Sequence, residues 1–549
     1  MRTHAKHRET PFLATIAVLV AVFIHPASAL AKVKPVDPAQ AAAEQAQILE
    51  QTKRSARVGS PHAQFTLANV YYQGEGATPD KLKAFVWMSL ATEYGYPDAA
   101  KLAKMIFQEL DQAQQQQATA LLEEYIGNYG KAALETMLLP KVIKENLGYK
   151  VRFARVSSRK KKDKERLDPA EYLGDDYPKR DIRELEDRSI MCSGFRDRRR
   201  FGFGLARRSY NFSGGTYWGT SYGEDRDYYL YGRDFFTQGS YFGAALPICA
   251  QRYFLNAEFD IAPDGTTRNI DMPFSYGLNS RRAIRKVRHY KFEKPTFKGE
   301  PVYFSTRIGL GNAGLSYALS KFSIYDRYPR LGRLIRKNKR NVKTGNAIDL
   351  YNYALTLIYI PGLRREPNAV EELLTAAAEQ GFDEAQFILG MKLYREQKDP
   401  EMAVRWIVEA AKQGLANAEY RLGKILLESP WFERDERKAA FWLNRAAKQG
   451  YVYALRDMAD LHLFAQTSNL HNAGKALTYL TRIERVDRYS PETFYSLAIA
   501  HKKDDDKRTA IKKLKKAIYI GNQLGRDVRE WKTMLGSWQA KGVVEIEEL

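Results

Sequence analysis

Residues 385–418 read AQFILGMKLYREQKDPEMAVRWIVEAAKQGLANA, and the same pattern returns at once in residues 418–454. Each stretch opens on an Ala, continues through a Leu-Gly pair, and places a Trp eight residues before a Gly. Residues 55–99 carry a third copy with the same Trp-to-Gly spacing. The three pairs are Trp406 and Gly414, Trp442 and Gly450, and Trp87 and Gly95. A long-range period of this kind is the sequence signature of a repeat architecture.

Each unit of 33 to 36 residues predicts two antiparallel helices. Small Ala residues let the helices approach, the aromatic side chains fill the groove between them, and Gly ends the second helix in a left-handed cap. A weaker copy has Leu373 in the Trp position and ends at Gly381. Further copies are expected in residues 455–484 and 492–521. We therefore expect repeat blocks at 55–140 and 349–540.

These units resemble Sel-one-like repeats, a branch of the tetratricopeptide superfamily. The resemblance rests on the period, the Trp, the Ala pair and the Gly together. It implies stacking of helix pairs into a superhelical solenoid that holds partner proteins. It also implies scaffolding roles in the envelope or in stress responses rather than catalysis.

Residues 253–309 follow a different period. Phe254, Asn256 and Glu258 alternate with apolar neighbours, and Pro263-Asp264-Gly265 predicts a two-residue hairpin turn into a second strand at 267–272. Residues 280–290 change to helical spacing with a basic outer face. Gly299 is expected to turn the chain into a third strand at 302–308. The predicted order is strand, strand, helix, strand.

This segment, 251–310, resembles the C-terminal domain of TonB, which links the bacterial inner membrane to outer-membrane receptors. The matching residues are Phe259-Asp260-Ile261, Asp264-Gly265, Asn269-Ile270, Ala283-Ile284, Tyr290-Lys291-Phe292 and Gly299-Glu300-Pro301-Val302. In that family the domain ends the chain, whereas here it lies inside it. The resemblance implies a peptide- or receptor-binding function.

The last strand is the candidate binding site, because an unpaired strand edge can add an extended peptide as a further strand. The candidate residues are Val302, Tyr303, Phe304, Ser305, Thr306, Arg307 and Ile308. Tyr303, Ser305 and Arg307 are expected to face one way, and the alternate residues the other. The alternative is that the chain's own aromatic segment covers this edge.

The first residues predict export. A basic start precedes an apolar run at 12–24 and small residues at 27–31, which is the layout of a secretory signal peptide over residues 1–31. The apolar run is shorter than the roughly 20 residues that a membrane span needs. An uncleaved inner-membrane anchor is the alternative. A Pro- and Ala/Gln-rich linker, 32–54, follows. We expect a periplasmic protein.

Residues 141–250 belong to no fold that the sequence identifies. Residues 151–166 form a solvated basic run, interpreted either as a flexible linker or as a site for an anionic envelope polymer or lipid head groups. A nucleic-acid partner is not expected behind an export signal. The two cysteines, Cys192 and Cys249, predict one disulfide in an exported chain, with two unpaired buried thiols as the alternative. Residues 311–348 form a second basic segment with helical character.

No motif for catalysis, metal binding or a cofactor is present. The 549-residue chain carries a net charge of +22, but its eight histidines are scattered and no nucleophile elbow or phosphate loop occurs. We predict a protein without enzymatic activity and without a cofactor. The fold class expected is α+β, mainly an α-helical repeat solenoid with a small inserted α+β domain.

Three functions are compatible with this sequence. The first is an exported cell-envelope interaction scaffold whose partners are envelope proteins, among them an extended peptide of an outer-membrane receptor. The second is an anchored TonB-type energy transducer for outer-membrane transport. The third is an enzyme acting on cell-wall glycan through the aromatic region at 170–250.

Overall fold

A computed structural model describes residues 38–153, 156–158, 254–276, 284, 287–311, 329–359, 363, 366, 368–484 and 486–539. The chain forms two compact units, residues 1–51 and 52–549. The described part of the first unit is the beginning of helix α1 (Pro38–Ala56), so the segment predicted as a linker is helical from Pro38 onward. The predicted signal peptide and the cysteine pair Cys192 and Cys249 lie outside the described residues. Among the helices described, none combines the length and apolarity that a membrane crossing requires.

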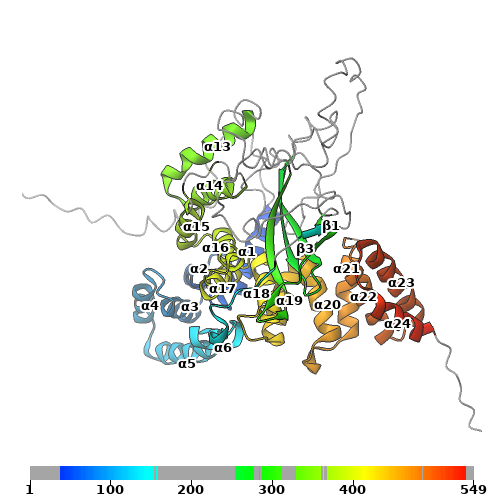
Figure 1. Ribbon diagram of the computed structural model, residues 1–549. Helices are drawn as coiled ribbons and strands as arrows, with labels where there is room; N and C mark the ends of the chain where they lie inside the picture. Colours follow the sequence, from blue (N-terminus) through cyan, green and yellow to red (C-terminus); the bar gives the residue numbers. More distant parts are fainter. Residues whose placement is uncertain are drawn as a thin grey trace, which may run out of the picture. The chain divides into compact units, whose positions relative to one another are not determined.

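The N-terminal block consists of five helices (Figure 1). They are α2 (Pro61–Gln73), α3 (Lys81–Glu93), α4 (Ala99–Gln108), α5 (Gln112–Tyr129) and α6 (Lys131–Leu138). Ser60 begins α2 because its side chain accepts a hydrogen bond from the backbone N–H of Ala63, and Pro61 occupies the first turn. Trp87 is buried against the rings of Tyr125 and Tyr129, at centroid distances of 5.4 and 5.5 Å. The Trp of this repeat is therefore a packing residue.

The C-terminal part is a series of helix pairs, coloured from green through yellow to red in Figure 1. The helices are α13 (Pro329–Asn341), α14 (Ala347–Tyr359), α15 (Ala369–Glu379), α16 (Asp383–Glu396), α17 (Pro400–Lys412), α18 (Ala416–Glu428), α19 (Glu436–Lys448), α20 (Val452–Phe464), α21 (Ala473–Ile483), α22 (Pro491–Lys503), α23 (Lys507–Leu524) and α24 (Arg529–Gln539). Short 3₁₀ turns lie at Lys144–Asn146, Val342–Thr344 and Ser468–Leu470. Polar N-cap residues such as Asp399, Asp435 and Asn472 begin the second helices.

The predicted glycines end the second helices as expected. Gly381, Gly414 and Gly450 all have left-handed backbone, with φ of 83°, 93° and 85°. The last repeat differs from the prediction, because α23 continues through Gly521 and ends at Gly525, whose φ is 68°. Gly521 instead lies where an added Cβ would meet Val528 at 2.6 Å, so it serves close packing.

Two more glycines set the spacing of paired helices. A Cβ on Gly390 of α16 would lie 2.7 Å from the carbonyl oxygen of Ala403, on α17. A Cβ on Gly423 of α18 would lie 2.6 Å from Leu443, on α19. The Leu-Gly pair of the repeat is therefore the point at which the two helices of a unit touch. The core around these contacts is built from the Ala and Leu residues of the period.

The inserted sheet has three strands in the order β3-β2-β7. They are β2 (Phe254–Ile261), β3 (Thr267–Tyr276) and β7 (Phe304–Gly311), and both pairings are antiparallel. Short strands β1 (Val156–Ser158), β4 (Tyr290–Phe292), β5 (Thr296–Phe297) and β6 (Glu300–Pro301) accompany it. We call residues 254–311 the β-insert. One face of its sheet packs on its own core, made by Ala257, Phe259, Ile261, Ile270, Val287, Tyr290 and Phe292.

Three predicted details of the β-insert are wrong: the length of the β2–β3 loop, the end of the helix and the start of the last strand. The β2–β3 loop has three residues, because Ala262 N–H bonds Thr266 O and Gly265 N–H bonds Ala262 O. Pro263 cannot adopt the positive φ that the favoured two-residue turn requires at its first position. Tyr290 begins β4 rather than ending a helix; of residues 280–287, the structure describes Ile284 and Val287, both helical.

The last strand begins later than predicted, at Phe304 rather than Val302, and runs to Gly311. A hairpin between β5 and β6 accounts for the delay. Phe297 pairs with Glu300, and Lys298 and Gly299 at its tip have φ of 51° and 95°. Both positive values match the two-residue turns that suit a right-twisted hairpin. Gly299 therefore closes a separate small hairpin instead of leading directly into the third strand.

The interpretation of residues 151–166 as a solvated run is wrong for its first part. Val151 is buried, and its backbone exchanges hydrogen bonds with the side chain of Gln397, with an N–H to Oε1 distance of 2.7 Å. Residues 156–158 form β1, which pairs with β4. β1 reads Val-Ser-Ser and carries no charge, so this part of the run can form a strand. The rest of the run lies outside the described residues.

Segment 138–149 joins the N-terminal block to the repeats. The indole N–H of Trp442 donates to Leu138 O at 2.9 Å, and that of Trp431 donates to Tyr149 O at 3.1 Å. Ile143 N–H returns a bond to Trp431 O at 2.8 Å. Trp431 is 1% exposed and also contacts the rings of Tyr394 and Phe297. Trp431 therefore links the joining segment, the β-insert and the helix pairs.

Candidate functional site

The second face of the β-insert is polar. Glu258 and Asp260 alternate with the buried apolar residues of β2, and their cross-strand partners on β7 are Arg307 and Ser305. Arg268 on β3 lies across from Asp260. A sheet with one apolar and one charged face ordinarily turns the charged face to water. In this protein the charged face meets the repeat helices instead.

The repeat helices supply the matching charges. Arg395 of α16 lies 2.7 Å from a carboxylate oxygen of Glu258, and Arg421 of α18 lies 2.6 Å from a carboxylate oxygen of Asp260. Both helices are the first of their pairs. The side chain of Asp260 is 3% exposed, so this is a buried ion pair. Lys424 of α18 adds a contact over the ring of Tyr303, at 5.4 Å.

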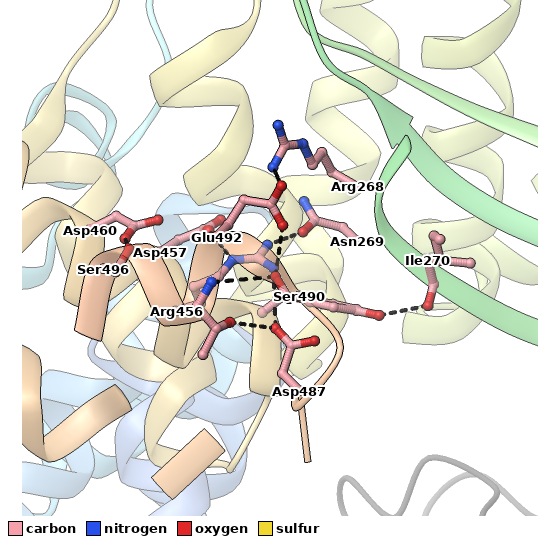
Figure 2. Close-up of polar contacts among 12 residues, drawn as sticks. Arg268, Asn269, Ile270, Arg456, Asp457, Asp460, Asp487, Ser490, Glu492 and Ser496 are labelled. Carbon is pink, nitrogen blue, oxygen red and sulfur yellow. Dashed lines mark hydrogen bonds and ion pairs between the residues drawn. The ribbon is translucent and has the colours of Figure 1, made fainter. Parts of the chain in front are cut away.

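A second group of contacts holds β3 (Figure 2). Arg456 of α20 reaches Asn269 and lies 3.5 Å from Asp487, while Arg268 pairs with Glu492 of α22. The hydroxyl of Tyr453 donates to Ile270 O at 2.6 Å, and Arg526 donates to Thr267 O at 2.9 Å. These bonds occupy backbone oxygens of β3. We call both groups of contacts together the charged interface.

Burial and charge shift several pKa values at the charged interface. Burial alone would raise the pKa of Asp260, but Arg421 and Lys424 hold it below its ordinary value. Burial, reinforced by repulsion from Arg526, lowers the pKa of Arg268 to about 10. Burial also raises the pKa of Glu428 to about 7 although Lys424 opposes it, since Lys424 is shared with Asp457. Asp260 and Arg268 are therefore both ionised at neutral pH.

The charged interface holds the β-insert against the repeat helices by ion pairs and hydrogen bonds. Asp460 accepts a hydrogen bond from Ser496 at 2.5 Å, but no histidine adjoins this pair in the described part of the interface. No group of three or more His, Cys, Asp or Glu side chains that could hold a metal occurs among the described residues. The chemistry of this site is ion pairing and strand anchoring.

The structure places the predicted peptide-binding residues at the sheet edge, but the first of them are covered. Val302 and Tyr303 precede β7 and are half-buried, and Arg307 is half-buried within it. Phe304, Ser305 and Thr306 are buried, and the hydroxyls of the latter two are without a hydrogen-bond partner among the described residues. Ile308 lies in β7, and its side chain is not described. The repeat helices cover the first half of β7.

The charged side chains of the repeat helices are the functional residues that the sequence analysis missed. Arg421, Lys424 and Glu428 recur three and four residues apart on α18, which places them on one helix face. A signal for this contact was present in the sequence. The charges are adjacent to the core residues Leu422 and Gly423, whereas the charges of a solvated helix face lie opposite the core.

Comparison with known families identifies the repeats. The family model described as Sel1 repeat matches residues 61–96, 383–415 and 416–451. These matches cover the three strongest copies of the sequence period. The chain therefore carries Sel1 repeats, and Sel1 repeat proteins commonly mediate protein–protein interactions. No match to the C-terminal domain of TonB supports that resemblance.

Two solved structures are similar to this chain. One is a Sel1 repeat protein from Oxalobacter formigenes, 22% identical over 38% of this chain and 58% of that chain, with a TM-score of 0.29. The other is c5321, a protective antigen of uropathogenic Escherichia coli with an SLR fold, 15% identical over 89% and 85% of the two chains, with a TM-score of 0.31. This chain thus spans little more than half of the Oxalobacter protein. The comparison with curated proteins finds no match.

Proposed function

We propose that this protein is an exported interaction scaffold of the cell envelope, in which Sel1 repeats hold the β-insert in place for partner binding. One observation carries the proposal. The polar face of the β-insert is fixed to the first helices of three successive pairs by the charged interface, through Arg395, Arg421 and Arg456. The repeats thereby use their own interaction surface to present a sheet. The predicted signal peptide supports the periplasmic location.

The binding element we propose is the second half of β7. In the sheet that the structure describes, β7 is an outer strand and pairs with β2 alone. Its buried first half, Phe304–Thr306, is blocked by the chain itself. Strand addition by an extended peptide would therefore take place along residues 307–311. The TonB resemblance, if it extends to function, makes an outer-membrane receptor peptide the partner.

Site-specific photo-crosslinking tests this function. A photoreactive amino acid at Leu310 of β7 should give crosslinks to an envelope protein in living cells. The same amino acid at Ile126, which is 42% exposed on α5, should not. Crosslinks of equal strength at both positions, or at neither, would reject β7 as the binding element.

Fractionation with N-terminal sequencing tests the location separately. A mature chain that begins near residue 30 and is found in the periplasm supports the scaffold. A chain that begins at Met1 and stays with the inner membrane would instead support an anchored energy transducer. The β7 crosslinks are informative in either case, because both functions use the strand edge.

A further inference from the structure

Helix α13 and the turn after it carry an unbroken set of positive charges. Residues 329–343 contain seven basic side chains and no Asp or Glu: Arg330, Arg333, Arg336, Lys337, Lys339, Arg340 and Lys343. Like charges three and four residues apart destabilise a helix by a few tenths of a kcal/mol per pair. The helix forms nonetheless, because its other face packs on the next helix. This charge density does not help the fold.

The described inner face of α13 packs on the neighbouring helix α14. Ile335 is buried in the core that includes α14, and the side chain of Asn338 donates to the hydroxyl of Thr356 at 3.1 Å. Arg333, Lys337 and Arg340 lie on the opposite face and are exposed. Their spacing of four and three residues aligns them along the helix axis. We call these residues, with Lys339 and Lys343, the basic face.

The basic face lines a shallow groove of about 570 Å³, to which Arg336 also contributes. All six lining side chains are cationic. In the described part of the chain, the first acidic residue after α13 is Asp349. Its carboxylate accepts hydrogen bonds from the side chains of Asn341, Thr344 and Asn346. Among the described residues, the Asp349 carboxylate is thus held by its own neighbours and does not neutralise the basic face.

We propose that the basic face of α13 binds the phosphate head groups of an anionic membrane surface. Each Lys or Arg near such a surface strengthens binding by about a factor of five, and the factors of neighbouring charges multiply. Because Ile335 is buried against the next helix, α13 binds head groups through its charges, without entering the acyl layer. The protein is held at the membrane by charge alone.

Two features favour a lipid surface over nucleic acid. Proteins that bind single strands interleave cations with aromatic side chains for base stacking, and the basic face has no aromatic residue. Duplex readers expose amides or other polar groups to base edges, but Asn338 is turned inward to Thr356. A row of charges on one helix face matches a planar array of phosphates.

Vesicle co-sedimentation of the full chain tests this proposal. Vesicles of equal parts phosphatidylglycerol and phosphatidylcholine should bind the protein at low salt, and vesicles of phosphatidylcholine alone should not. Replacing Arg333, Lys337, Arg340 and Lys343 together by Gln should weaken binding by more than about 100-fold. Replacing the two arginines by Lys should preserve it. Raising the ionic strength from about 0.1 M to 1 M shortens the screening length from about 10 to about 3 Å and should abolish binding.

Helix α23 supplies the matched control. Lys507, Arg508, Lys512 and Lys515 are exposed on it, and their replacement by Gln lowers the net charge equally. We expect less than about a threefold effect, because charge distant from the surface is screened. Equal losses in both variants, or unchanged binding in the α13 variant with its helical circular dichroism intact, would overturn the proposal. Tighter α13-dependent binding to a short DNA duplex than to vesicles would assign the face to nucleic acid instead.

Discussion

Arg421 and Asp260 show how a single ion pair fixes the β-insert. Their side chains are 14% and 3% exposed and lie 2.6 Å apart, and Asn269 gives the carboxylate a further bond at 2.7 Å. Removing both charges from water is costly, so the pair contributes little net stability. Removing one partner is different, because the other charge is then buried alone. The pair therefore specifies one docking position more than it stabilises the fold.

Arg421→Met should raise the rate of local opening at the charged interface. We expect a loss of about 3–5 kcal/mol in the free energy of opening, measured by hydrogen exchange of the β2 amides. The double variant Arg421→Met with Asp260→Asn should lose less, because no lone charge remains.

Lys141→Gln is the matched control for this pair. It breaks the Lys141–Glu433 pair, whose side chains are 72% and 50% exposed, and should change stability by less than about 1 kcal/mol. A loss at Arg421 as small as at Lys141 would show that the interface is not buried in solution.

The ion pair of Asp260 also predicts a pH dependence. Because the pKa of Asp260 is lowered, its contribution to stability is present at neutral pH. That contribution is lost as the pH falls below the ordinary pKa of an Asp and through the lowered pKa of Asp260.

Glu428 should give the opposite pH dependence. Its pKa is raised to about 7, so its contribution to stability is complete below pH 4.5 and is lost as the pH rises through about 7. Glu428→Gln, which stays neutral, should raise the melting temperature at pH 8 and leave it nearly unchanged at pH 5. Melting curves monitored by circular dichroism check this. A stabilisation of the same size at both pH values would show that Glu428 does not titrate in this range.

At the scale of single helices, the Leu-Gly pair makes a clear prediction. Gly390→Ala should lower the melting temperature, because its Cβ would lie 2.7 Å from a backbone oxygen of α17 that cannot move aside. The cost of such overpacking is about 1–3 kcal/mol.

Gly536→Ala provides the control within helix α24. No atom lies within 4 Å of its added Cβ, so the variant should be stabilised by up to about 1 kcal/mol through helix propensity alone. If both alanines stabilise the protein equally, the helices of the repeat do not touch at Gly390.

Helices were predictable from the sequence where local spacing decides them. The Trp, Ala and Gly positions of residues 61–96, 383–415 and 416–451 sufficed, because each repeat packs mainly on its neighbours. The strands of the β-insert followed from alternation, and their ends shifted where Pro263 and the Lys298-Gly299 turn changed the loop geometry. The charged interface could not be predicted. Glu258 and Arg395 are far apart in the chain, and an alternating strand does not reveal which side of it meets water.

For the whole molecule, Trp431 is the residue that couples the parts. Its ring and backbone contact the segment at 143–149, Phe297 in strand β5, and Tyr394 on α16. Trp431→Ala should destabilise the protein by about 3–5 kcal/mol and split one thermal transition into two, because three parts lose a shared contact.

Trp87→Ala is the control that separates the loss of coupling between parts from the loss of a large buried side chain. Trp87 is also buried but contacts Tyr125 and Tyr129 within the N-terminal block. It should lower the temperature of the single transition without splitting it. Scanning calorimetry of the two variants distinguishes these outcomes, and a single shared transition in the Trp431 variant would contradict the coupling.

The charged interface also means that the repeats carry a tethered internal ligand. A segment tied to its own binding surface has an effective concentration on the order of millimolar. Any outside protein that used the same faces of α16, α18 and α20 would compete with the β-insert at that concentration. We therefore expect partners of this protein to bind surfaces that its own chain leaves unoccupied.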